Sequence, residues 1–180
     1  MRSRYPDNYD PGMRTNQGVE WGAHCAVVLA MLPPGASLSA AALAEYHGVP
    51  GPYLAKTLQA MAGGGLVQAS PGRGGGYRLA RSADRITLFD VVRAIEGEAS
   101  LFRCTEIRKR GPARAPARSY SPVCAIAGAV WRAESAWEHE LASTTIADLA
   151  AEVGRQAPPT AITRSIRWLG TRVTVPSGAG

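Results

Sequence analysis

Four residues of this chain have side chains and spacings suited to binding a metal. Glu20 and His24 lie four positions apart, so in a helix both side chains emerge from one face, one turn apart. A carboxylate and an imidazole placed in this way can bind a metal, pair with each other, or simply be polar residues at a helix start. Cys104 and Cys124 add two thiols to a chain with only three cysteines. Zinc also binds sets of cysteine, histidine and glutamate, so it stays open as an alternative.

The charge of the chain favours a nucleic-acid partner. The 180 residues are 46% hydrophobic, enough to form a core, and 20 Lys and Arg against 14 Asp and Glu give a net charge of +6. A basic chain suits a polyanion, of which nucleic acid is the commonest.

Cysteine usage and hydropathy predict the compartment. A low, odd number of cysteines argues against a disulfide framework and is typical of a reducing cytoplasm. We expect the third cysteine, Cys25, to be a small buried hydrophobe. The N-terminus is polar, and the most apolar stretch, 25–34, is too short to span a bilayer. We therefore expect a cytoplasmic protein with no membrane partner.

Hydrophobic periodicity predicts a mainly α-helical fold with one small β-hairpin. Apolar residues at helical spacing, bounded by caps and by proline or glycine stops, predict helices over 19–32, 39–47, 52–62, 87–96, 122–141 and 145–153. Two short apolar runs, 66–69 and 77–80, flank a glycine-rich turn and predict the hairpin. Thr145 and Asp148 have the spacing of a capping box. The order of these elements is that of a winged helix-turn-helix followed by a long helix.

The predicted helix 52–62 occupies the place of the helix that enters the major groove in a helix-turn-helix. Polar side chains near its start can bond phosphates or base edges, and an arginine in the glycine-rich turn suits a minor groove or phosphates. The predicted DNA contacts are Ser39, Tyr53, Lys56, Thr57, Gln59, Arg73 and Arg78. The competing interpretation makes Tyr53 a core residue and Lys56 a solvated one. Helix order, proline position and the basic turn together favour DNA binding.

Five short strings within residues 19–153 carry a family resemblance. They are Tyr53-Leu54-x-Lys56, Gly65-Leu66-Val67, Gly74-Gly75-Gly76-Tyr77-x-Leu79, Ile86-Thr87-Leu88-x-Asp90-Val91-Val92 and Thr144-Thr145-Ile146-x-Asp148-Leu149. On these strings the chain resembles the bacterial winged helix-turn-helix regulators that include IscR, NsrR and RsrR. The resemblance implies a homodimer built on the long helix and binding to a palindromic operator in double-stranded DNA.

The same resemblance bears on the cofactor. Most cluster-bearing relatives place three cysteines close together before the dimer helix, whereas this chain has Cys104 and Cys124, twenty positions apart. It is more similar to the RsrR type, which holds a 2Fe-2S cluster through Glu, His and two Cys. The resemblance implies that Glu20, His24, Cys104 and Cys124 are the cluster ligands, with the Glu/His pair and the Cys pair supplied by different subunits.

The chemistry of such a site suggests a redox switch. Each iron needs two protein ligands, and replacing thiolate by imidazole raises the reduction potential. A carboxylate is a weaker ligand, and reduction weakens its bond to iron further. The strength with which the cluster binds the first helix therefore changes when one electron is added. Trp21, beside Glu20, is the hypothetical relay to the DNA-reading helix, although simple packing accounts for it equally well.

The resemblance and the predicted elements together divide the chain into five parts. We expect a disordered N-terminal extension (1–17), a winged helix-turn-helix DNA-binding domain (18–97), a cluster-binding loop (98–121), dimerisation helices (122–153) and a flexible C-terminal tail (154–180). Apolar residues in that tail leave one short further helix open.

The expected function is a redox-responsive transcriptional regulator, most simply a repressor, and not an enzyme. A thiol-dependent enzyme lacks support because no Cys-x-x-Cys motif or ordered Cys/His/Asn set occurs. An electron carrier is disfavoured by the basic reading helix. The main alternative is a metal-free or zinc-containing winged-helix regulator that responds to a small ligand.

Overall fold

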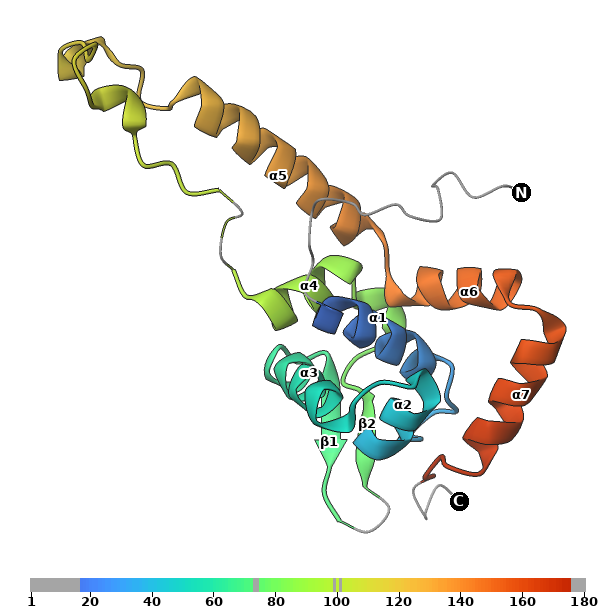
Figure 1. Ribbon diagram of the computed structural model, residues 1–180. Coiled ribbons are helices and arrows are strands. Elements are labelled where there is room, and N and C mark those ends of the chain that lie inside the picture. Colours follow the sequence, from blue (N-terminus) through green and yellow to red (C-terminus); the bar gives the residue numbers. More distant parts are fainter. Residues whose placement is uncertain (1–16, 73–74, 99, 101, 176–180) are drawn as a thin grey trace.

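The computed structural model describes residues 17–72, 75–98, 100 and 102–175 (Figure 1). Its main elements are α1 (Gln17–Ala30), α2 (Ala40–His47), α3 (Gly51–Gly63), β1 (Val67–Ser70), β2 (Gly76–Leu79), α4 (Leu88–Glu96), α5 (Ala125–Ser143), α6 (Ile146–Gln156) and α7 (Pro159–Gly170). The predicted fold class, mainly α with a small β-hairpin, is confirmed. The extension predicted over residues 1–17 lies outside the described residues except for Gln17.

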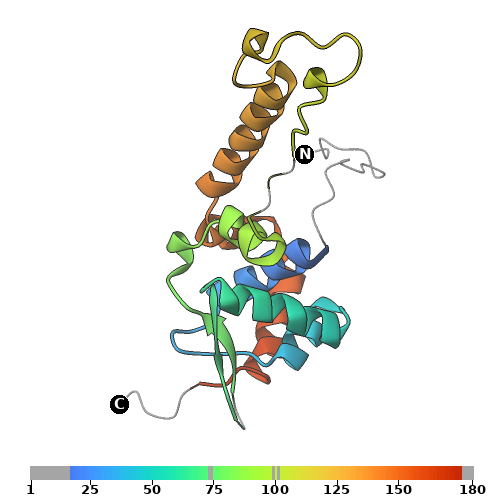
Figure 2. The ribbon, with the colours of Figure 1, turned by 90° about the vertical axis from the view of Figure 1, so that its left-hand side faces the viewer.

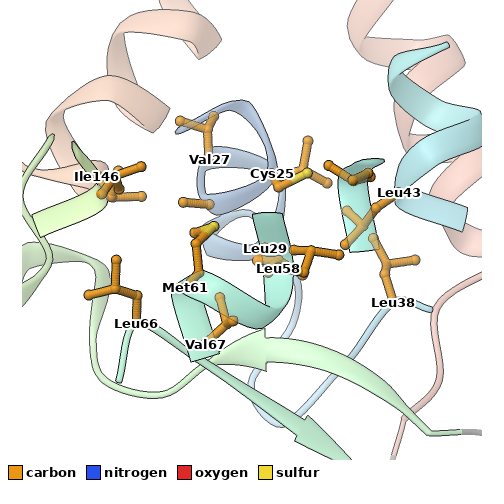
Figure 3. Packing of buried hydrophobic residues seen from close by; sticks show 14 of the residues in the cluster. Cys25, Val27, Leu29, Leu38, Leu43, Leu58, Met61, Leu66, Val67 and Ile146 are labelled. Atoms are coloured by element: carbon orange, nitrogen blue, oxygen red, sulfur yellow. The ribbon is translucent and has the colours of Figure 1, made fainter. Parts of the chain in front are cut away.

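The core gathers around α1, which packs against α3, α4 and α6. Cys25 of α1 is fully buried, as predicted, and lies on the side of α1 toward Leu43 of α2 and Leu58 of α3 (Figure 3). On α3 the buried residues are Leu54, Thr57, Leu58 and Met61, which follow the helical period. Because α1 contributes to the core along most of its length, it forms the central support of the domain.

Helices α2 and α3 form the helix-turn-helix, and local signals set their ends. Ser39 caps α2 by accepting a hydrogen bond from the backbone N–H of Ala42 at 3.1 Å. Gly48 ends α2 in the left-handed conformation, with φ of 65°. Pro52 stands in the first turn of α3, where a missing N–H costs nothing. These signals produce the short turn that the sequence predicts.

The hairpin β1–β2 is antiparallel, with Val67 opposite Leu79. Leu38, just before α2, pairs with Tyr77 on the other edge of β2. Here the backbones approach so closely that a Cβ on Gly76 would come within 2.6 Å of the Leu38 carbonyl oxygen. The hairpin β1–β2, the wing of this fold, therefore packs directly against the start of the helix-turn-helix.

Helix α5 and the loop before it project from the rest of the molecule, at the end opposite the strands β1 and β2 (Figures 1 and 2). Only Ala127 is buried among the 19 residues of α5. Three large apolar side chains at or near its first half are exposed, namely Val123, Ile126 and Trp131. This helix therefore has a long surface without a covering partner in a single chain.

The expected flexible tail over 154–180 requires correction. Helix α6 continues to Gln156, and α7 follows directly and packs against α2 through Trp168 and Tyr46, whose ring centroids are 5.4 Å apart. Beyond α7, the backbones of Thr174 and Ser37 exchange hydrogen bonds of 2.9 and 3.0 Å. The apolar side chains of α7 recur at helical spacing and cover the core, which is why the segment folds.

No helix among the described residues is both long enough and apolar enough to cross a membrane.

Candidate metal centre and nucleic-acid interface

Helix α1 presents the predicted carboxylate and imidazole to the outside. Glu20 and His24 are both exposed, and the position between them on the helix is taken by the buried Gly22. A Cβ on Gly22 would come within 2.7 Å of Ile95 of α4. The close packing of α1 beneath this pair fixes the backbone that carries it.

His24 also has a neighbour that the sequence did not reveal. Its ring centroid lies 5.8 Å from that of His47, the last residue of α2. Burial, and then the charge of His24, lower the pKa of His47. The buried Nε2 of His47 finds no hydrogen-bond partner among the described residues. The candidate ligand helix is thus in contact with the helix-turn-helix through two imidazoles.

Cys104 and Cys124 lie side by side on the projecting loop. Cys124 is the N-cap of α5, and the backbone N–H groups of Ala127 and Ile126, followed by Arg108 and Cys104, lower the pKa of its thiol. Cys104 contacts the Glu106 carboxylate, with a Sγ–Oε1 distance of 3.9 Å. A loop of some twenty residues therefore closes to bring two thiols together in a polar, half-buried setting.

A cavity lies beside Cys104, the first thiol of the pair. Its volume is about 650 Å³, and its lining includes Cys104, Glu106, Phe102 and Trp131 but not Cys124. Thiolates are the usual protein ligands of iron–sulfur clusters. The chemistry of the two thiols therefore fits such a group, with two ligands supplied by this loop.

The two candidate ligand pairs are far apart within one chain. Figure 1 places α1 in the body of the molecule and the loop at the outer end of α5. In the part of the chain that the structure describes, no group of three or more His, Cys, Asp or Glu could hold a metal ion. The structure brings Cys104 to Cys124 and Glu20 to His24, and it does not bring one pair to the other. The expectation that the pairs meet across two subunits stays a prediction.

The outer face of α3 carries three of the predicted DNA contacts. Tyr53 is 67% exposed, and Lys56 and Gln59 are exposed beside it. The prediction for Thr57 is wrong. Its side chain is buried, and its hydroxyl donates to the Tyr53 carbonyl at 3.3 Å. Thr57 lies between Leu54 and Met61 on the face that the helical period turns inward.

The remaining predicted DNA contacts belong to the wing and to α2. Arg78 is half-buried and donates to the Gln68 side chain across the hairpin, with an Nη2–Oε1 distance of 3.1 Å. Ser39 is exposed while it caps α2. Arg73 lies outside the described residues.

A cavity of about 390 Å³ connects the candidate ligand helix with the reading helix. Trp21 of α1 lines it together with Tyr53, Lys56 and Thr57 of α3. A shift of α1 would therefore first change the surroundings of Tyr53 and Lys56, the two exposed side chains of α3 that line this cavity. This position suits the relay role of Trp21, which stays a prediction.

Comparison with known proteins gives a consistent picture. A family model described as "Rrf2: Iron-dependent Transcriptional regulator" matches residues 15–152. The chain is 29% identical over 142 residues to YffB of Lactococcus lactis, covering 78% of this chain and 88% of that protein, which is named as an HTH-type transcriptional regulator. It is 33% identical over 91 residues to YwgB of Bacillus subtilis, named likewise, covering 51% of this chain and 58% of that protein.

Solved structures share the fold. CymR, the global cysteine regulator of B. subtilis, aligns with a TM-score of 0.62 at 25% identity, over 78% of this chain and 98% of that one. IscR of T. potens aligns with a TM-score of 0.61 at 23% identity, over 84% of this chain and 97% of that one. The family model ends before α7, so that helix lies beyond the matched region.

Proposed function

Because the chain belongs to the Rrf2 family of transcriptional regulators, we propose that it binds DNA as a homodimer and responds to the redox state of a 2Fe-2S cluster at the dimer interface. Its relatives are named as transcriptional regulators, not enzymes. The family assignment comes from the sequence match over residues 15–152. The cluster, its ligands and the operator are the parts that this proposal adds.

One observation carries the cofactor proposal: the loop supplies a preassembled pair of cysteines, and α1 supplies an exposed Glu/His pair. Each pair offers two donors, and a two-iron cluster needs four. Glu20 and His24 face solvent in the single chain, where a partner subunit can reach them. The loop that carries Cys104 and Cys124 lies at the outer end of α5, away from α1 of the same chain (Figure 1). Two subunits would together complete the ligand set.

Helix α5 is the proposed dimer contact. An isolated amphipathic helix is stabilised mainly by packing its apolar stripe against a partner, and α5 buries one residue in the single chain. Ile126 is 67% exposed and Val123 is 47% exposed. Apolar side chains in this number on a projecting helix are typical of an interface between copies. The arm that carries the cysteines would then lie against the partner subunit.

A homodimer of this kind would read a palindromic operator. Helix α3 would enter the major groove, where Gln59 can bond base edges and Lys56 can bond a phosphate. Twofold symmetry of the protein would be matched by twofold symmetry of the DNA. Repression is the expected mode, because a dimer on an operator blocks access to the promoter.

When bound, the cluster would supply reversible acceptance of one electron. The residues of this chain would hold it in unequal ways. The two thiols are soft donors, and the Glu20 carboxylate is a hard oxygen donor that favours ferric iron. Glu20 is therefore the ligand most sensitive to redox state, and it stands on the helix that carries Trp21. From Trp21 the path to Tyr53 and Lys56 crosses a single cavity.

The alternative is a cluster-free regulator that responds to a small ligand. A groove of about 510 Å³ between α2 and α7 favours it, with aromatic walls from Tyr46 and Trp168 and two arginines, Arg164 and Arg167, at its edge. This groove touches the helix-turn-helix directly. A ligand there would act on α2 and would not involve the projecting loop.

The decisive experiment is anaerobic purification followed by a visible spectrum before and after dithionite. We expect a reddish-brown protein that bleaches on reduction and contains two iron atoms per site. Cys104→Ala and Cys124→Ala should each be colourless, while Cys25→Ala keeps the colour. For the second pair, His24→Ala should lose or shift the spectrum, and His139→Ala on the exposed face of α5 is the matched control. A colourless wild-type protein, with or without zinc, would favour the alternative.

A further inference from the structure

The side chain of Arg108 joins the two ends of the projecting loop, the segment that carries Cys104 and the segment that carries Cys124. Its guanidinium lies between these two segments, which are called the two limbs of the loop. Nη2 donates to the Ser121 carbonyl at 2.7 Å, and Nη1 donates to the Val123 carbonyl at 3.5 Å. Both acceptors are backbone carbonyls in the short segment just before Cys124. A planar fork of five donors is suited to this kind of bridging.

The same guanidinium also binds the limb that carries Cys104. Nε donates to Glu106 Oε2 at 3.1 Å, and Nη2 lies 3.4 Å from Oε1. The Oε1 atom in turn faces Cys104 Sγ at 3.9 Å. Glu106 adopts a left-handed backbone with φ of 54°, uncommon for a residue with a side chain, and this aims its carboxylate back at Arg108. Arg108 is therefore connected to Cys104 through the Glu106 carboxylate.

Tyr120 completes the closure from the outer side of the loop. Its ring lies 5.3 Å from the guanidinium carbon of Arg108. Its hydroxyl donates to the Arg108 carbonyl at 2.8 Å and accepts from the Ala115 N–H at 2.7 Å. The Arg108 side chain is only 22% exposed, whereas the neighbouring residues 109–119 are all exposed. Arg108 is therefore the central residue of this network of contacts.

We propose that Arg108 is a positioning residue: it holds Cys104 and Cys124 together as a two-thiol chelate before any cofactor binds, and it places a fixed positive charge beside both sulfurs. The inference rests on the proposed function only in naming an iron–sulfur cluster as the natural occupant. The geometry of the chelate stands without it. Without Arg108, nothing else described in the loop joins the Glu106 carboxylate to the backbone before Cys124.

The first test uses cluster-free protein, reduced and free of metal, with phenylarsine oxide as the probe. Its arsenic forms two As–S bonds to two adjacent thiols and releases water, with no change of oxidation state. Wild-type protein should bind one equivalent tightly. Arg108→Gln should bind at least about tenfold more weakly, because the effective concentration of the second thiol falls when the limbs separate. Arg118→Gln, an exposed arginine of the same loop, is the matched control and should bind like wild type.

Arg108→Lys separates the two roles of the side chain. It keeps the charge but has no planar fork, so it should bind the arsenical nearly as weakly as Arg108→Gln. In cluster-loaded protein, a positive charge beside the sulfurs stabilises the form that has gained one electron from dithionite. The midpoint potential of Arg108→Gln should therefore move to more negative values, and that of Arg108→Lys should return toward wild type.

The outcomes distinguish this inference from the proposed cofactor. If Arg108→Gln binds phenylarsine oxide as tightly as wild type, the positioning role is wrong, whatever the colour of the protein. If wild-type protein never holds a cluster but Arg108→Gln loses the arsenical, the cofactor proposal fails and the positioning role stands. Tyr120→Phe provides a second variant that leaves Arg108 in place, and a several-fold weakening there supports the same network. Circular dichroism should show all variants folded, because the loop lies outside the core.

Discussion

Thr87 and Thr145, the N-cap residues of α4 and α6, lie opposite one another in an antiparallel bridge. Each caps its helix through a complete capping box, in which the threonine hydroxyl accepts from the N3 backbone and an aspartate accepts in return. Leu88 N–H donates to the Thr144 carbonyl at 2.9 Å, and Ile146 N–H donates to the Ile86 carbonyl at 2.8 Å. This joint fixes the helix that follows the projecting α5 to the DNA-binding domain.

Loss of either cap should lower the stability of the whole domain. Thr87→Ala and Thr145→Ala should each reduce the free energy of unfolding by about 1 kcal/mol. The double variant should depart from the sum, because the two caps share one bridge. Denaturant unfolding at fixed protein concentration measures this. Thr160→Ala, at an exposed site in α7, is the control, and an equal loss there would contradict the prediction.

Gly22 should not tolerate a side chain. An alanine Cβ would meet Ile95 at 2.7 Å, Met61 at 3.2 Å and Val91 at 3.3 Å. Gly22→Ala should therefore cost about 1–3 kcal/mol of stability through overpacking. The control is Gly63→Ala, where nothing lies within 4 Å and a small gain is expected. Thermal unfolding of both variants would decide the matter. A Gly22→Ala protein as stable as wild type would mean that α1 lies less close to α4 than described.

Lys56 and Thr57 should differ sharply in DNA binding although they are neighbours. Lys56→Ala removes an exposed cation of α3 from each subunit of the proposed dimer, so the slope of log affinity against log salt should fall by about 2. Thr57→Val should leave DNA affinity unchanged, because its side chain faces the core. Fluorescence anisotropy with an operator fragment at several salt concentrations measures both. Weakened binding by Thr57→Val at unaltered thermal stability would contradict the inward placement.

Cys25 should be chemically silent in the folded protein. Burial raises the pKa of its thiol to about 12, and the thiolate is the reactive form. Cluster-free native protein at pH 8 should therefore react with Ellman's reagent at two thiols, Cys104 and Cys124, and denatured protein at three. Cys25→Ala should leave the native count at two. Rapid modification of three thiols in native protein would show that α1 opens readily.

The helix beyond the matched family region should contribute to stability. The Tyr46 hydroxyl bonds to Ser165 at 2.9 Å, and Trp168 packs beside the same ring. Trp168→Ala should cost about 1–2 kcal/mol, less than at a fully buried site because the indole is half-exposed. Arg167→Ala, exposed on the same helix, is the control. Thermal unfolding compares the two, and equal melting temperatures would indicate that α7 does not stay docked in solution.

Local interactions allowed the sequence alone to predict much of this protein. Helix periods, proline and glycine stops, and threonine caps act over a few residues, so the order of elements and the capping box at Thr145 were predictable. The outward position of Tyr53 follows from the same period. That period also places Thr57 on the inner face with Leu54 and Met61, so this error could have been avoided from the spacing.

Contacts between distant segments needed the tertiary structure. The local sequence does not predict that α7 packs on Tyr46, or that Arg108 joins the two limbs carrying Cys104 and Cys124. Such contacts depend on the fold of the whole chain. The apolar side chains of 159–170 recur at helical spacing, but that spacing does not say that Trp168 packs against Tyr46 of α2. The sequence by itself therefore determined the elements and the residues capable of chemistry. The tertiary structure alone decided which of those residues meet, since long-range packing sets the distances between side chains.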